Sequence, residues 1–192
     1  VEEKLGEVAK TTAGGTPLKS HEEYYKNGLI PWLRSGEVGV REITESKMFI
    51  TELGLENSSA KLVPKNSVMI AMYGATAGEV GVLKFESSTN QAVCAILPND
   101  KLKPEFLYYF FLNEKEKLVS QAVGNAQPNI SQQKIKNTLI PFLSIELQEK
   151  IVGQLDNLIS QTQSLESNYQ QELDALDELK KSILQKAFNG EL

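Results

Sequence analysis

The last quarter of the chain, residues 144–192, reads SIELQEKIVGQLDNLISQTQSLESNYQQELDALDELKKSILQKAFNGEL. It contains no proline and only two glycines, so nothing interrupts a helix over most of its length. We predict one helix from about Ile145 to about Ala187, with Ser144 as its N-cap and Gly190 just beyond its end. A helix of this size is about 65 Å long, which is too long for a domain of this size to cover.

The apolar residues of this helix have the spacing of a coiled coil. In the first half of the helix, successive apolar residues are alternately four and three residues apart, and they form one stripe along the helix. Beyond it, Glu172 occupies the position that a strict heptad would give to an apolar residue, and Leu173 continues the stripe instead. This is a local shift of register. We expect pairing with another long helix, and a single helix lying along its own domain is the alternative. The predicted dimerisation residues are Ile151, Leu155, Leu158, Leu165, Tyr169, Leu173, Leu176, Leu179 and Ile183.

The first three quarters of the chain, residues 1–143, have a different pattern. They hold all seven prolines and eleven of the thirteen glycines, and these residues separate short apolar runs typical of strands. The expected strands are Ile30–Leu33, Lys47–Thr51, Ser67–Tyr73, Val80–Phe85 and Gln91–Leu97, and the expected helices are Pro104–Gln121 and Ser131–Lys136. The sequence therefore predicts an α+β protein, with a mixed domain rich in short strands at 1–143 and one long C-terminal coiled-coil helix at 144–192.

The charge and the reactive residues limit the possible functions. The 192 residues have a net charge of −5, but residues 1–143 are neutral and the acidic excess lies in residues 144–192, so the total does not argue against DNA binding. The single Cys94 and the single His21 exclude an internal disulfide and a His/Cys zinc site. We expect Cys94 to be an inert buried thiol and His21 a solvated loop residue.

No motif of the chain supports catalysis. The glycine-rich stretches at 12–17 and 73–81 lack the Gly-Lys-Ser/Thr ending of a phosphate-binding loop, and no Pro-Pro pair exists for the catalytic tetrapeptide of a DNA methyltransferase. We therefore expect no catalytic residue, no metal site and no cofactor on this chain. No apolar run is long enough for a membrane span and no signal sequence opens the chain, which predicts a cytoplasmic protein.

Several short segments, taken in their order along the chain, resemble the specificity (S) subunit of Type I restriction–modification systems. This chain resembles a half-length form of it, with one target recognition domain and one conserved helical region. The resemblance runs over essentially the whole chain. It is carried by LGEV at 5–8, GGTP at 14–17, IPWLRSGEV at 30–38, MYGATAGEVG at 72–81, TNQAV at 89–93, GNAQPNIS at 124–131 and LKKSILQKAFNGEL at 179–192.

The resemblance implies a non-catalytic subunit that recognises double-stranded DNA. Residues 1–143 then look like a target recognition domain, and residues 144–192 look like the helix that sets the spacer and docks partners. The implied partners are modification subunits, which transfer methyl from S-adenosylmethionine to adenine, and restriction subunits. A typical S subunit carries two such units, so this chain is either a half-length subunit or a piece of a full one. On its own it is expected to form an antiparallel homodimer and to read a split palindrome.

Two other functions stay open at this point. One is a coiled-coil adaptor or inhibitor that pairs with intact specificity subunits without binding DNA, and the other is an independent enzyme. For the DNA-binding function, polar and basic residues of residues 1–143 are the candidate contacts, because Lys and Arg hold phosphates while Asn and Gln read bases. These candidates are Lys19, Arg34, Arg41, Tyr73, Thr76, Asn125, Gln127, Asn129 and Lys134, whereas Trp32, Gly74 and Gly78 are assigned to core and turns.

Overall fold

The computed structural model describes residues 1–120 and 129–191 of the chain. It divides into two compact units, which are described separately: a β-rich unit, Val1–Glu149, and a helical unit, Lys150–Leu192. The long helix α5 (Ile145–Phe188) begins in the first unit and runs through the second.

A mixed five-stranded sheet forms the centre of the β-rich unit, in the order β2-β10-β7-β8-β4. Its strands are β2 (Thr11–Ala13), β4 (Glu42–Ile43), β7 (Val68–Ala71), β8 (Val80–Leu83) and β10 (Val93–Ile96). Strand β4 runs parallel to β8, and the other neighbours are antiparallel. Every residue of β7, β8 and β10 is buried, so both faces of the sheet are covered.

Alternate residues of the central strands supply two different cores. Val68, Ile70 and Cys94 face the core that contains Phe111 of helix α3 (Pro104–Ser120), whereas Met69 lies in a second core with Leu33. This follows from the two-residue period of a strand, which sends successive side chains to opposite faces. Continuous apolar runs are therefore required in β7 and β10, and their sequences provide them.

A second sheet of four strands lies beside the first, in the order β5-β3-β9-β6. Its members are β3 (Ile30–Leu33), β5 (Phe49–Ile50), β6 (Leu62–Val63) and β9 (Ser87–Thr89), and β3 runs parallel to β9. The backbone N–H of Gly15 donates to the carbonyl of Thr89 at 2.9 Å, so the segment after β2 crosses to this sheet. A Cβ on Gly14 would lie 1.9 Å from that same carbonyl oxygen, so only glycine allows the crossing.

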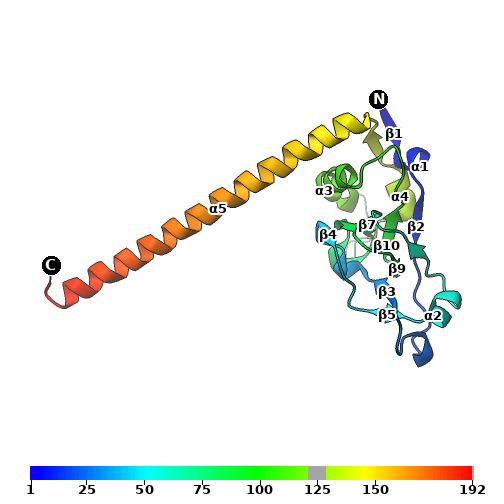
Figure 1. Ribbon diagram of the computed structural model, residues 1–192, viewed down its shortest axis with the longest axis horizontal. Coiled ribbons are helices and arrows are strands. Elements are labelled where there is room, and N and C mark those ends of the chain that lie inside the picture. The colour runs from blue at the N-terminus through cyan, green and yellow to red at the C-terminus, as the bar shows by residue number, and fades with distance from the viewer. Residues whose placement is uncertain (121–128, 192) are drawn as a thin grey trace. The chain divides into compact units, whose positions relative to one another are not determined.

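Short elements complete the β-rich unit. Figure 1 shows β5 and α2 (Glu52–Glu56) at one end of this unit and β1 (Glu2–Lys4) and α1 (Leu5–Val8) at the other. Strand β1 pairs antiparallel with β11 (Leu139–Pro141). The remaining elements are α4 (Gln132–Asn137) and three single turns of 3-10 helix, η1 (Glu22–Tyr24), η2 (Ser35–Glu37) and η3 (Gly74–Thr76).

The predicted α+β class is confirmed, and so is the long helix, which ends one residue beyond the predicted Ala187. All five predicted strands exist, although four are shorter than predicted. Both shorter helices also exist, and the hydroxyl of Ser131 caps α4 by accepting a hydrogen bond from the backbone N–H of Lys134 at 3.3 Å. Six further strands were not predicted: β1, β2, β4, β6, β9 and β11.

The apolar stripe of the helical unit is exposed. Leu165, Tyr169 and Leu173 are 54%, 62% and 58% exposed. Such exposure of a regular apolar stripe is unusual in a helix, because a stable amphipathic helix normally buries that face. No helix within residues 1–120 and 129–191 has both the length and the hydropathy required to cross a membrane.

Candidate nucleic-acid interface

Two of the predicted DNA contacts, Lys19 and Arg34, line the same pocket of the β-rich unit. The pocket has a volume of about 420 Å³. Its lining consists of Thr16, Lys19, Tyr25, Trp32, Arg34, Met48, Asn90 and Gln91. Residues from five separate segments of the sequence therefore meet here, and three of these segments belong to motifs that carry the resemblance.

The aromatic part of the pocket is fixed by hydrogen bonds to the Gly-Gly-Thr-Pro segment. The indole N–H of Trp32 donates to the carbonyl of Gly15 at 2.9 Å, and the hydroxyl of Tyr25 donates to the carbonyl of Pro17 at 2.5 Å. The two rings meet edge to face, and partial burial raises the pKa of Tyr25 above its ordinary value. Trp32 is only 4% exposed, which confirms its assignment to the core.

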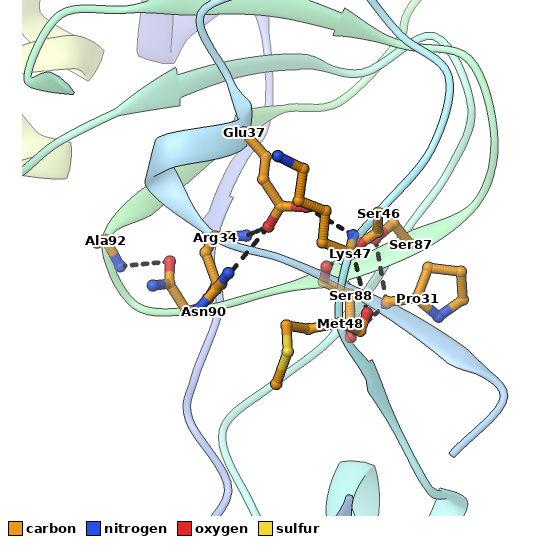
Figure 2. Close-up of polar contacts among 10 residues, drawn as sticks. All are labelled: Pro31, Arg34, Glu37, Ser46, Lys47, Met48, Ser87, Ser88, Asn90 and Ala92. Carbon is orange, nitrogen blue, oxygen red and sulfur yellow. Dashed lines mark hydrogen bonds and ion pairs between the residues drawn. The ribbon is translucent and has the colours of Figure 1, made fainter. Parts of the chain in front are cut away.

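Glu37 holds Arg34, which lines the pocket, and Figure 2 shows the contacts between these two residues. One carboxylate oxygen accepts the backbone N–H of Arg34 at 3.0 Å and lies 3.6 Å from its guanidinium Nε. The other oxygen accepts the backbone N–H of Lys47 at 2.7 Å. Both carboxylate oxygens thus make contacts with the protein, and the Arg34 side chain, which is 47% exposed, is held through its Nε.

Two side-chain amides, those of Asn90 and Gln91, also line the pocket and come directly after strand β9. The Oδ1 of Asn90 accepts the backbone N–H of Ala92 at 3.1 Å, and Figure 2 shows this bond. The Oε1 of Gln91 accepts the hydroxyl proton of Thr16. Neither amide was among the predicted contacts, although both belong to the motif at 89–93, which was the sequence signal that could have indicated them.

A second group of predicted contacts lies at the turn between β7 and β8. Tyr73 is exposed and forms a β-bridge with Asn129, while Thr76 ends the 3-10 turn η3. Gly74 and Gly78 have φ angles of +75° and +83°, which residues other than glycine rarely adopt. Their assignment to turns is therefore confirmed, and the turn brings Tyr73 and Asn129 together.

The other predicted contacts lie apart from these groups. The guanidinium carbon of Arg41 stacks over the ring of Tyr109 in α3 at 5.3 Å from its centroid. Lys134 lies in α4 and lines a different surface hollow together with Leu118. Asn125 and Gln127 lie outside the described residues. The structure thus brings together one pair of predicted residues, Lys19 and Arg34, and one group of three, Tyr73, Thr76 and Asn129. Their contact with DNA stays a prediction.

Cys94 and His21 have the environments that the sequence analysis expected. Cys94 is fully buried, and desolvation raises the pKa of its thiol to about 12. His21 is half-exposed, and its Nδ1 lies 2.8 Å from Glu23 Oε1, an interaction that lowers the pKa of Glu23. No group of three or more metal-binding side chains occurs among residues 1–120 and 129–191.

Comparison with known proteins identifies the family. The family model described as the Type I restriction modification DNA specificity domain matches residues 1–175, which include the β-rich unit and much of α5. The specificity subunit of the Type I restriction enzyme EcoR124I/EcoR124II from Escherichia coli is 29% identical over 88% of this chain and 43% of its own length. The MjaIX specificity subunit from Methanocaldococcus jannaschii is 30% identical over 81% of this chain and 38% of its own.

Solved structures have the same fold. A chain from a study of complex assembly and conformational transition in a type I R-M system has a TM-score of 0.75 at 24% identity, over all of this chain and 46% of its own length. The HsdS subunit of Thermoanaerobacter tengcongensis has a TM-score of 0.73 at 23% identity and is covered over 45% of its length. The chain spans less than half of the relatives that it matches, and it belongs to the Type I restriction modification DNA specificity domain family.

Proposed function

We propose that this chain is the DNA recognition element of a Type I restriction–modification complex and has no catalytic role of its own. In this proposal the β-rich unit binds one half of a split DNA target, and partner subunits perform adenine methylation and restriction there. S-adenosylmethionine would bind to the modification subunit, not to this chain. The observation that carries the proposal is the family match, which covers a recognition unit and most of one long helix.

We also propose that two copies pair through their helical units in an antiparallel arrangement. The exposed stripe needs a partner, and its spacing is compatible with an antiparallel second copy. Stripe residues lie at equal distances of 4, 7, 14 and 18 residues on both sides of Tyr169. These pairs are Leu165 and Leu173, Thr162 and Leu176, Leu155 and Ile183, and Ile151 and Ala187.

This symmetry defines a register for the antiparallel pair. If Tyr169 of each copy lies at the two-fold axis, every one of these residues faces its counterpart on the second copy, so the apolar layers coincide. One layer departs from the pattern, because Leu158 lies opposite Lys180 with Leu179 beside it. The shift of register, which is the additional four-residue step from Tyr169 to Leu173, lies at the centre of the pair. An antiparallel partner presents its steps of four and three residues in the reverse order, so the spacing is the same on both sides of the axis.

A two-fold arrangement of recognition units has a consequence for the DNA target. Two identical units related by a two-fold axis read the same half-site on opposite strands. The target of the complex is then a palindrome divided by a spacer of fixed length. A chain that contributes two different recognition units has no such restriction.

The methylation pattern of DNA tests the whole proposal. The chain is expressed with its modification subunit, and methylated adenines are mapped by sequencing that reports modified bases directly. We expect one motif, with two identical half-sites on opposite strands and a constant spacer. Absence of methylation would overturn DNA recognition, whereas two unlike half-sites would overturn only the symmetric dimer.

Disulfide cross-linking tests the register separately. Under mild oxidation, Tyr169→Cys should give a covalent dimer, because the two thiols meet at the axis within disulfide distance. Ser164→Cys is the matched control, since Ser164 lies on the face of the helix opposite the stripe and should remain monomeric under denaturing electrophoresis. Efficient cross-linking of the control, or none at Tyr169→Cys, contradicts the register.

A further inference from the structure

The side-chain oxygens of the amides around the pocket of Lys19 and Arg34, and of the neighbouring Glu37, each already accept a hydrogen bond from the protein. Asn90 Oδ1 accepts from Ala92 and Gln91 Oε1 accepts from Thr16. The neighbouring Glu37 uses both carboxylate oxygens on the backbone N–H groups of Arg34 and Lys47, at 3.0 and 2.7 Å. The Tyr25 hydroxyl donates to a carbonyl.

The groups that remain at the rim are donors. Asn90 and Gln91 retain their amide N–H groups, Lys19 has three ammonium donors, and Arg34 has its terminal guanidinium N–H groups. Lys19 is exposed and has no ion-pair partner among the described residues. The ligand that such a rim accepts must carry several hydrogen-bond acceptors and negative charge.

We propose that this pocket binds a phosphate of the DNA backbone and acts as an anchor that does not depend on base sequence. This inference rests on the proposed function, since it needs DNA at the β-rich unit. A phosphodiester carries one negative charge, shared by two acceptor oxygens, and has no donor, so it matches a rim of cations and amide N–H groups. Arg34 is suited to this role because its ion pair with Glu37 limits the freedom that binding would otherwise remove.

The shape and chemistry of the pocket argue against base reading. Asn and Gln read adenine with the amide oxygen and nitrogen together, and here each amide oxygen already accepts a hydrogen bond from the protein, which restricts how the amide can turn toward a base. The major-groove edge of guanine also offers acceptors only, but it lies at the floor of a groove about 8.5 Å deep. A helix or loop that protrudes from a protein can reach the floor of the major groove, but a recess in the protein surface cannot. A recess instead receives a group that projects from the duplex, and the phosphates of the backbone project in this way.

The dependence of DNA affinity on salt tests this assignment. The complex of the full chain with its modification subunit is titrated with a duplex containing the methylated motif and with a scrambled duplex, over 0.05 to 0.2 M salt. For Lys19→Ala we expect about tenfold weaker binding to both duplexes. The slope of log affinity against log salt should fall by about 0.9, the value for one lost phosphate contact. Arg34→Gln should act in the same direction.

The control is Lys65→Ala, which removes an exposed lysine from a turn that does not line the pocket. It should leave both affinity and slope unchanged, and the methylation motif should be the same for all variants. If both pocket variants keep the wild-type slope, the phosphate site is overturned. A loss confined to duplexes with guanine at one position would assign base reading instead. If the wild-type complex binds neither duplex, the proposed function itself fails.

Discussion

The side chain of Gln148 offers a sharp test of how the beginning of α5 is attached within the β-rich unit. It is completely buried, and both its amide nitrogen and its amide oxygen make hydrogen bonds to the backbone. Its amide nitrogen donates to the carbonyls of Lys101 and Leu143 at 2.8 and 2.9 Å, and its Oε1 accepts the backbone N–H of Lys103 at 2.9 Å. Replacing Gln148 by alanine removes three hydrogen bonds and leaves three backbone groups without this partner.

The expected cost follows from these contacts. Each lost bond in a buried site costs about 1 kcal/mol, so the total is about 3 kcal/mol. For a unit of this size each kcal/mol lowers the melting temperature by about 3 °C, so Gln148→Ala should melt about 9 °C below the wild type in scanning calorimetry. Gln154→Ala is the control, because Gln154 is exposed on the same helix and should melt within about 2 °C of the wild type. Equal melting temperatures for the two variants would refute the reasoning.

Two further predictions concern the β-rich unit. Because burial raises the pKa of Cys94 to about 12, the native thiol should not react with an aromatic disulfide reagent at pH 8, and it should react with one equivalent in denaturant; rapid labelling of the native chain would contradict this. Gly14→Ala should strongly lower the melting temperature, because its Cβ would lie 1.9 Å from the carbonyl oxygen of Thr89, whereas Gly36→Ala, with nothing within 4 Å, should melt like the wild type. Similar melting of the two glycine variants would show that the crossing after β2 tolerates a side chain.

The elements that the sequence predicts well are those whose pattern is local. Strand β3 begins and ends where predicted because an apolar run is bounded by turn residues, and α5 follows from its spacing and its lack of proline. Strand β9 was missed because its Ser-Ser-Thr sequence is typical of a turn. It is a strand because it pairs with β3 and β6, and the hydroxyls of Ser87 and Ser88 donate to the carbonyl of Pro31.

The candidate site was predictable only in part for the same reason. Lys19 and Arg34 were named from residue type alone, and nothing in the sequence indicates that they share a pocket. Asn90 joins them because β9 runs parallel to β3, and the backbone N–H of Asn90 donates to the carbonyl of Leu33 at 3.0 Å. Parallel pairing of strands far apart in sequence leaves no local signal, so this grouping required the structure.

The pairing of β1 with β11 has a consequence for how the β-rich unit can be exchanged for another. Glu3 lies opposite Ile140 in this ladder, and the backbone N–H of Phe142 donates to the carbonyl of Val1 at 2.9 Å. The polypeptide therefore enters and leaves the β-rich unit at one place, immediately before α5. The segment between β1 and β11 therefore begins and ends at neighbouring positions. Domains whose two ends lie close together in this way tolerate replacement by another domain. A different segment grafted between β1 and β11 would have its two chain junctions side by side in one ladder, and the helix that follows would keep its own sequence and spacing.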